Sequence, residues 1–149
     1  MAACHYFAFG SNLPLTRLRE RAPSAHPLGA AQLAGFRLCL DKRSVDGSGK
    51  LNLAREAGAL VWGAVFQLAE AELAALDGFE AGYSRITVSV SLRERGALEA
   101  HTYLSEQREA GLRAAPGYKA LVLAGAREHG LPADWIEQLE GLPVRDAQR

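Results

Sequence analysis

Cysteine, an excess of one charge and long hydrophobic runs are all scarce in this chain of 149 residues, and each absence excludes a class of protein. The two cysteines, Cys4 and Cys39, are too few for a disulfide framework and too far apart for a metal-ligand set or a CxxC redox motif. Each stands among apolar residues, which predicts two buried free thiols in a reducing compartment. The four histidines have no mutual spacing typical of metal ligation, so we expect no metal site.

The charge balance argues against a nucleic-acid partner. The chain has 17 basic and 17 acidic residues, a formal net charge of zero, and no basic run.

The apolar stretch Leu60–Leu68 stops far short of the ~20 residues that a membrane span needs. No positively charged leader precedes the first strand, so we expect a cytoplasmic protein without a signal peptide. We expect a small-molecule partner, no membrane association, and a monomer or a homodimer.

The composition, 48% hydrophobic and 23% charged residues, is typical of one folded domain covering residues 1–149. The periodicity and turn signals predict the following elements: a strand ending at Phe9, a short helix from Pro14, an extended segment 29–40, a short strand 51–53, a central strand 60–68, a helix ending near Gly78, a hairpin of strands 85–92 and 98–104, and helices 118–129 and 133–139. The order, with strands first and helices at their junctions and at the end, predicts an α+β fold with an antiparallel or mixed sheet that curls to remove its edges.

The first candidate functional segment is the loop after the first strand, Phe9-Gly10-Ser11-Asn12. Glycine allows a sharp turn, and successive N–H groups in such a turn can bind an anion, with Ser11 and Asn12 adding side-chain donors. The start of a helix near Pro14 would add its dipole. The alternative is that a Gly-Ser-Asn turn only ends a buried strand.

The second candidate is Glu80, a carboxylate between Phe79 and Ala81. An apolar setting raises the pKa of a carboxyl group, which suits a general base near neutral pH. The alternative is a solvated glutamate at a helix end. Asp77 competes for the catalytic role, but we assign it to a local turn at the helix terminus.

Two tyrosines are secondary candidates for the same pocket. Tyr103 lies on the last predicted strand, and Tyr118 follows Pro116-Gly117 at a helix start. Either could present its hydroxyl to a substrate, although a buried tyrosine with one satisfied hydrogen bond is the more common arrangement.

These segments together resemble the gamma-glutamyl cyclotransferases, which share an AIG2-like barrel. The segments that carry the resemblance are Tyr6-Phe7-Ala8-Phe9-Gly10-Ser11-Asn12-Leu13, Val61-Trp62-Gly63, Leu76-Asp77 ahead of Glu80, Pro116-Gly117-Tyr118-Lys119, and Gly125 to Pro132. They occur in the family's order along nearly the whole chain. The resemblance implies a small closed mixed β-barrel with peripheral helices, and an enzyme that releases 5-oxoproline from a gamma-glutamyl substrate without a cofactor.

The resemblance also assigns roles to individual residues. Glu80 falls on the catalytic glutamate, and the substrate-binding set is Tyr6, Phe7, Ala8, Phe9, Gly10, Ser11, Asn12, Tyr103 and Tyr118. The chain departs from the family at Phe9, where a tyrosine is common, so a hydroxyl contact is absent there. Asn12 argues against the glutathione-specific branch, which typically reads Gly-Ser-Leu, and against the gamma-glutamylamine branch, which reads Gly-Thr-Leu. The alternative function is a non-catalytic module that binds a small anion or a protein on the same barrel.

Overall fold

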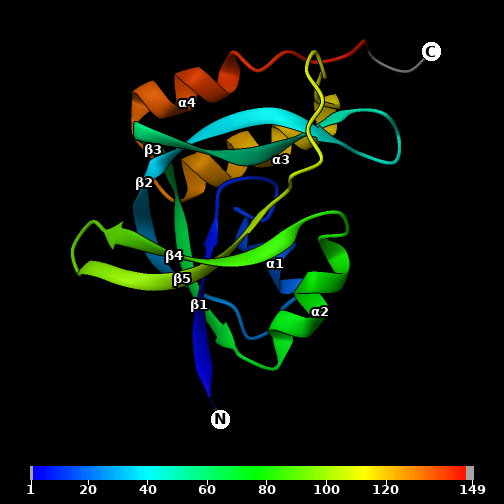
Figure 1. The fold of residues 1–149 in the computed structure, drawn as a ribbon. Coiled ribbons are helices and arrows are strands. Elements are labelled where there is room, and N and C mark those ends of the chain that lie inside the picture. Colours follow the sequence, from blue (N-terminus) through cyan, green and yellow to red (C-terminus); the bar gives the residue numbers. More distant parts are fainter. Residues whose placement is uncertain (1, 147–149) are drawn as a thin grey trace.

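The strands close into a barrel in the computed structural model, which describes residues 2–146 (Figure 1). The strands are β1 (Ala3–Ala8), β2 (His26–Arg43), β3 (Gly49–Ala69), β4 (Ser84–Leu92) and β5 (Gly96–Leu104). Around the barrel they follow the order β1-β3-β2-β4-β5. The pairs β1–β3, β2–β3, β2–β4 and β4–β5 are antiparallel, and β1–β5, which closes the barrel at Tyr6 and His101, is parallel. The expectation of a closed mixed β-barrel is confirmed.

Two very long strands replace the short ones that we expected in the first half of the chain. The predicted strands 51–53 and 60–68 are both parts of β3, which pairs with β2 from His26–Gln67 to Arg43–Gly49. The segment between them is a bulge and not a turn. On the two sides of Gly35, Ala34 pairs with Leu60 and Phe36 pairs with Arg55, so β3 uses more residues here than β2. Gly35 and Gly58 both have a φ of +85°, a conformation that favours glycine and bends the pair without ending it.

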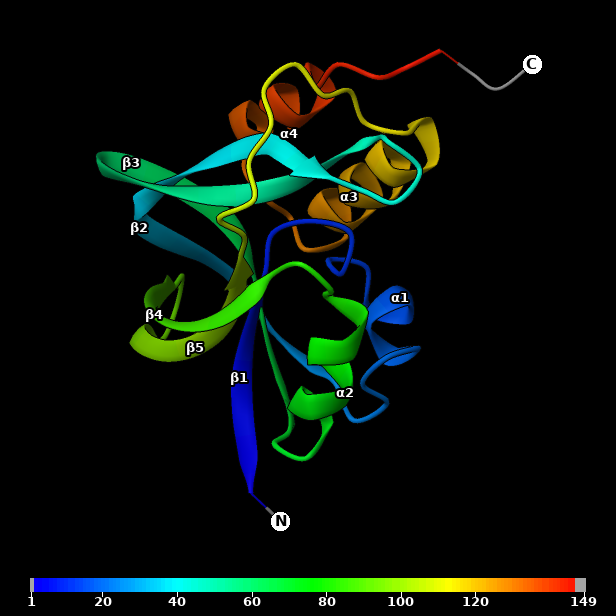
Figure 2. The ribbon, with the colours of Figure 1, turned by 45° about the vertical axis from the view of Figure 1, so that its right-hand side comes forward.

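Four helices among residues 2–146 lie outside the barrel (Figure 2). Helices α1 (Leu15–Arg19) and α2 (Glu72–Phe79) lie near each other on one side, and α3 (Pro116–Glu128) and α4 (Ala133–Glu140) lie together at one end. The sequence predicts that the helix from Pro14 continues to Arg21, but α1 ends at Arg19. The segment between β5 and α3, yellow in both views, crosses the long β2–β3 pair.

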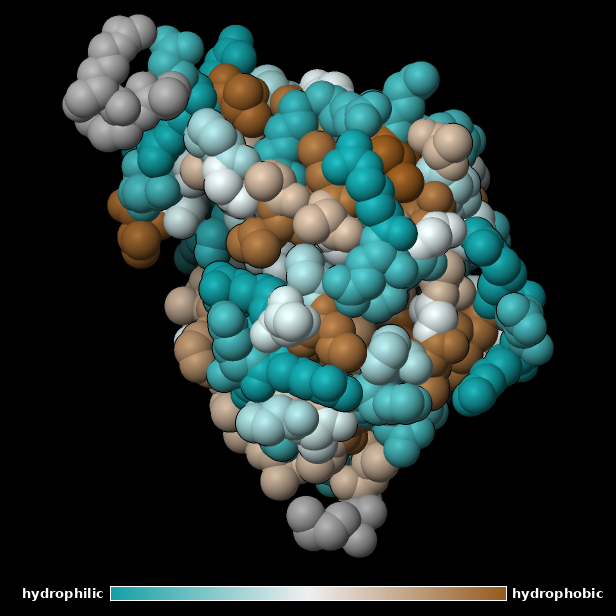
Figure 3. Space-filling model, turned by 180° about the vertical axis from the view of Figure 1, so that it is seen from behind, coloured by the Kyte–Doolittle hydropathy of each residue, from teal (hydrophilic) through white to brown (hydrophobic). Residues whose placement is uncertain are grey.

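The barrel interior and the helix contacts form one hydrophobic core. Its largest fully buried side chains include Phe7, Leu13, Leu33, Val65 and Phe66. On the face opposite to that of Figure 1, hydrophilic and hydrophobic residues are intermingled (Figure 3). None of the helices in the described part of the chain is long and apolar enough to cross a membrane.

Candidate active site

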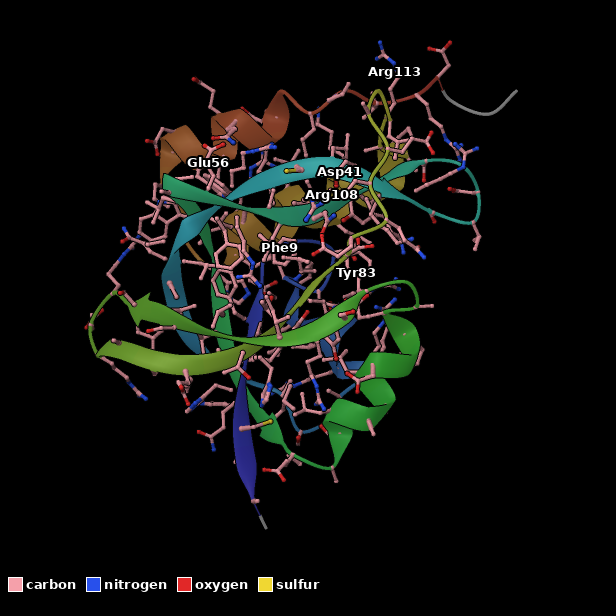
Figure 4. The ribbon with its side chains drawn as sticks, viewed as in Figure 1. Phe9, Asp41, Glu56, Tyr83, Arg108 and Arg113 are labelled. Carbon is pink, nitrogen blue, oxygen red and sulfur yellow. The ribbon has the colours of Figure 1, made fainter. Side chains whose placement is uncertain are left out.

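A cavity lies where the end of β1, the start of β3, the C-terminus of α2 and the N-terminus of α3 meet. The residues that line it are Tyr6, Phe9, Gly10, Ser11, Asn12, Lys50, Leu51, Glu80, Tyr83, Tyr103 and Tyr118. Figure 4 labels two of them, Phe9 and Tyr83. The cavity thus joins segments that are up to 112 positions apart in the sequence, from Tyr6 to Tyr118.

Glu80 is the carboxylate of this cavity. It follows the last residue of α2, and its N–H donates to the carbonyl oxygens of Leu76 and Asp77, so the helix end fixes its backbone. Burial raises the pKa of the Glu80 carboxyl above its ordinary value, while the nearby cations Arg21, Lys50 and Arg17 act in the opposite direction. A buried carboxyl with an elevated pKa is suited to accept a proton and return it near neutral pH.

Asn12 connects Glu80 to the β1 side of the cavity. Its side chain is only 3% exposed, and its Nδ2 donates to the Tyr6 hydroxyl at 3.0 Å and to Glu80 Oε1 at 3.3 Å. Its Oδ1 accepts a hydrogen bond from Arg21 Nη1 at 3.3 Å. The Arg21 guanidinium in turn lies 4.9 Å from the ring centroid of Phe79, which is 52% exposed. Asn12 therefore fixes the position of the carboxylate on which acid–base chemistry would depend.

The loop at residues 10–12 lines the cavity and carries backbone donors without a partner among the described residues. The Leu13 N–H donates to the Gly10 carbonyl at 3.1 Å and closes a turn, and no described residue accepts a hydrogen bond from the N–H of Gly10, Ser11 or Asn12. The reason for glycine at position 10 differs from the expected one. Its φ is not positive, but an added Cβ would lie 3.2 Å from the Tyr118 hydroxyl oxygen. Close approach, and not backbone conformation, favours glycine here, because a side chain would require the Tyr118 hydroxyl to move by a few tenths of an ångström.

The helix dipole expected behind this loop is engaged elsewhere. Helix α1 has only five residues, and its first N–H, on Leu15, donates to the Glu128 carboxylate of α3 at 3.0 Å. The expectation that this helix supports an anion in the cavity is therefore wrong, because the protein's own carboxylate already caps it.

Three tyrosine hydroxyls anchor the far wall of the cavity. The Tyr118 hydroxyl oxygen accepts the Leu51 N–H at 2.9 Å, and the Tyr83 hydroxyl donates to the Leu51 carbonyl at 2.8 Å. The Tyr103 hydroxyl donates to Asp77 Oδ1 at 2.5 Å. Burial raises the pKa of the cavity tyrosines Tyr6, Tyr83, Tyr103 and Tyr118, so all four hydroxyls are neutral at physiological pH.

Asp77 does more than the local turn that we assigned to it. Besides accepting the Tyr103 hydroxyl, its Oδ1 lies 3.6 Å from Arg85 Nε, so it connects α2 to the hairpin of β4 and β5. The end of the helix explains the difference between the two carboxylates, because Asp77 lies within α2 and Glu80 lies just beyond its last residue. Three positions separate Asp77 from Glu80, and only Glu80 lies where the chain leaves the helix toward the cavity.

Not every predicted substrate-binding residue reaches the cavity. Phe7 and Ala8 are fully buried in the core and do not line the cavity. Both pack closely around Gly63, where an added Cβ would lie 2.2 Å from the Ala8 carbonyl oxygen. Three lining residues, Lys50, Leu51 and Tyr83, were not identified from the sequence. Tyr83 carried a signal, as an aromatic residue in a Gly-rich turn next to Glu80. Lys50 carried none, because its position depends on the β2–β3 register.

The cysteines and histidines are distributed without a common site. Cys39 is buried as expected, but Cys4 is only partly buried, at the exposed end of β1. Within residues 2–146, no group of three His, Cys, Asp or Glu side chains is placed to hold a metal ion.

Comparison with known proteins assigns this barrel to a class and then to a family. A model of the AIG2-like family matches residues 60–139. Gamma-glutamylcyclotransferase from Homo sapiens is 32% identical over 95% of this chain and 79% of its own length, and the Mus musculus protein is 32% identical over 92% and 77%. A solved structure of a gamma-glutamyl cyclotransferase, 30% identical, superposes with a TM-score of 0.91 over 99% of this chain and 92% of that chain. The chain therefore belongs to the gamma-glutamyl cyclotransferase family.

Proposed function

We propose that this cavity converts gamma-glutamyl amino acids into 5-oxoproline and the free amino acid, with Glu80 as the proton carrier. The observation that carries the proposal is the buried Glu80 carboxyl, held by Asn12 opposite a turn whose N–H groups have no partner among the described residues. The substrate-binding role extends to Tyr6, Phe9, Ser11, Tyr103 and Tyr118, which line the same cavity.

The reaction needs only a proton carrier and an oxyanion site. The substrate's own α-amine attacks its γ-carbonyl carbon, a five-membered ring forms, and the bond to the leaving nitrogen breaks. Because nucleophile and electrophile belong to one molecule, the protein has only to hold the bent conformer. Glu80 accepts the proton that the attacking nitrogen loses and delivers it to the leaving nitrogen. The N–H groups of residues 10–12 are suited to the oxygen that becomes negative in the transition state.

The tyrosines suit this reaction in a supporting role. Leu51 and Asp77 hold the hydroxyls of Tyr83, Tyr118 and Tyr103, so these side chains form rigid walls rather than competing bases. The Tyr118 oxygen accepts a hydrogen bond from the Leu51 N–H, which leaves the Tyr118 O–H available to a substrate or to Glu80.

A cytoplasmic location and a monomeric or homodimeric state belong to the same proposal, and the unpaired cysteines Cys4 and Cys39 support the location.

The first test compares substrates by their release of 5-oxoproline. We expect gamma-glutamyl-alanine to be turned over efficiently. Glutathione, and gamma-glutamyl-lysine linked through the side-chain amine of lysine, should be poor substrates, because the chain has Gly-Ser-Asn where the other branches have Gly-Ser-Leu or Gly-Thr-Leu. If glutathione gave the highest kcat/KM, the substrate class proposed here would be wrong.

The second test removes the proton carrier alone. Glu80→Gln keeps the volume and an amide oxygen for Asn12, so the protein should fold and bind substrate, while kcat falls by at least ~10²-fold, the lower end for a general acid–base group. Asp77→Asn is the matched control, because its Oδ1 can still accept the Tyr103 hydroxyl, and it should retain most activity. Equal losses in the two variants, or full activity in Glu80→Gln, would contradict the assignment of Glu80 as the proton carrier.

A further inference from the structure

Lys50 is a charged residue of the cavity that the chemistry above does not use. Of the described residues that line the cavity, it alone is cationic, and it stands directly before Leu51, whose backbone is held on both sides by Tyr118 and Tyr83. The side chain is half-buried. Its strand position is therefore fixed, and its ammonium lies close enough to Glu80 to affect the pKa of that carboxyl.

No carboxylate of residues 2–146 lies within ion-pair distance of the Lys50 ammonium. None of the ion pairs among residues 2–146 includes it. The residue directly opposite on β2 is another cation, Lys42, and like charges across a strand pair are destabilising. Asp41, the carboxylate next to Lys42, is held by Arg108 at 3.3 Å, and Figure 4 shows the two side by side. An unpaired ammonium on a cavity wall, opposite a second lysine, suits an anion that arrives with the ligand.

The substrate class supplies two carboxylates. The three N–H groups at residues 10–12 serve the glutamyl half, its α-carboxylate and its developing oxyanion, and the other anion-binding group among the described residues that line the cavity is Lys50. The α-carboxylate belongs to the glutamyl half, which must reach Glu80 and the N–H groups at residues 10–12 because the reacting atoms are there. The carboxylate of the leaving amino acid has no partner among those groups. We infer that Lys50 binds the carboxylate of the leaving amino acid, so that the enzyme selects gamma-glutamyl amino acids over gamma-glutamyl amines. The inference rests on the proposed function.

The experiment uses two substrates that differ in this carboxylate alone. Gamma-glutamyl-ethylamide is gamma-glutamyl-alanine without its leaving-group carboxylate. We expect the wild-type protein to prefer gamma-glutamyl-alanine by about tenfold to a hundredfold in kcat/KM, as for a hydrogen bond to a charged group. Lys50→Met should bring that ratio close to one, and Lys50→Arg should keep most of it.

Lys42→Met is the matched control. It removes the same charge from the opposite strand, at a lysine whose Nζ donates to the Arg43 carbonyl at 3.0 Å and which does not line the cavity. It should leave the ratio at its wild-type value. The inference is overturned if the wild-type protein does not discriminate between the two compounds, or if Lys50→Met slows both equally, which would place the α-carboxylate at Lys50.

Calorimetric binding separates this inference from the proposed function. The dissociation constants of both compounds are measured with Glu80→Gln and with the Glu80→Gln, Lys50→Met double variant. A preference for gamma-glutamyl-alanine that disappears with Lys50→Met supports the inference even if no protein releases 5-oxoproline, which would overturn the proposed function alone. A preference for gamma-glutamyl-alanine that is equally strong in both variants contradicts the inference about Lys50.

Discussion

At the scale of single residues, the cavity is organised around one carboxylate and one amide. Asn12 contacts Glu80, Tyr6 and Arg21 at once, so a change there would disturb the carboxylate, a hydroxyl and a cation together. The electrostatic setting of Glu80 is a balance, because burial favours its neutral form while Arg21, Lys50 and Arg17 favour its charged form. Burial dominates, so the pKa of Glu80 is raised.

The raised pKa predicts the pH dependence of the reaction. A general base works only when ionised, so the acid limb of kcat/KM should lie above the pKa of an exposed glutamate. Lys50→Met removes one of the cations that lower this pKa and should move the limb to still higher pH. The measurement is the pH profile of kcat/KM for gamma-glutamyl-ethylamide in both proteins. A wild-type limb at the ordinary glutamate value would contradict the assignment of Glu80.

At the scale of elements, helix α3 holds the segment that follows the cavity loop. Gly125 allows the closest approach, since an added Cβ would lie 2.3 Å from Leu13 Cβ and 2.8 Å from Pro14 Cδ. Near the end of the same helix, the His129 ring nitrogen Nε2 lies 2.6 Å from the Leu13 carbonyl oxygen, and Glu128 accepts the Leu15 N–H. The loop at residues 10–12 is therefore held between β1 and a segment fixed by α3.

This contact predicts a difference between two glycines of one helix. Gly125→Ala should lower the free energy of unfolding by roughly 1–3 kcal/mol, because the methyl group forces α3 away from Leu13. Gly117→Ala is the control, since nothing lies within 4 Å of its added Cβ, and alanine at an open helical position is neutral or slightly stabilising. Urea denaturation of both variants measures the difference. Equal stabilities would show that α3 adapts without cost.

At the scale of the whole molecule, barrel closure brings the two halves of the site together. The parallel pairing of β1 with β5 places Tyr6 next to the strand that carries Tyr103, and the two rings meet edge to face with centroids 6.0 Å apart. The described residues form no cluster for a metal ion, and in the proposed reaction the only group that the protein itself carries is a proton.

The corresponding prediction concerns chelators. Dialysis against EDTA should leave kcat/KM for gamma-glutamyl-alanine unchanged, because the proposed mechanism uses only Glu80 and backbone N–H groups. Addition of Zn²⁺ to the dialysed protein should not increase activity. A loss of activity with EDTA that zinc restores would contradict the proposed mechanism.

The sequence by itself determined the class of the fold and the position of the carboxylate. Alternating apolar residues define strands, and the linear motifs around Gly10, Glu80 and Tyr118 carry the family resemblance, which the comparisons confirm. These features are local, so they can be seen along a single chain. The roles of Glu80 and its neighbours stay predictions, which the experiments above address.

Only the tertiary structure decided what each of these residues contacts. The β2–β3 register places Lys50 on the cavity wall, and the bulge at Gly35 and Gly58 joins two predicted strands into one. Phe7 and Ala8, inside the most recognisable motif, pack in the core instead of the cavity. Asp77 gains its partners from β4 and β5. Such contacts depend on strand pairing between residues far apart in the chain, and no local pattern of side chains encodes them.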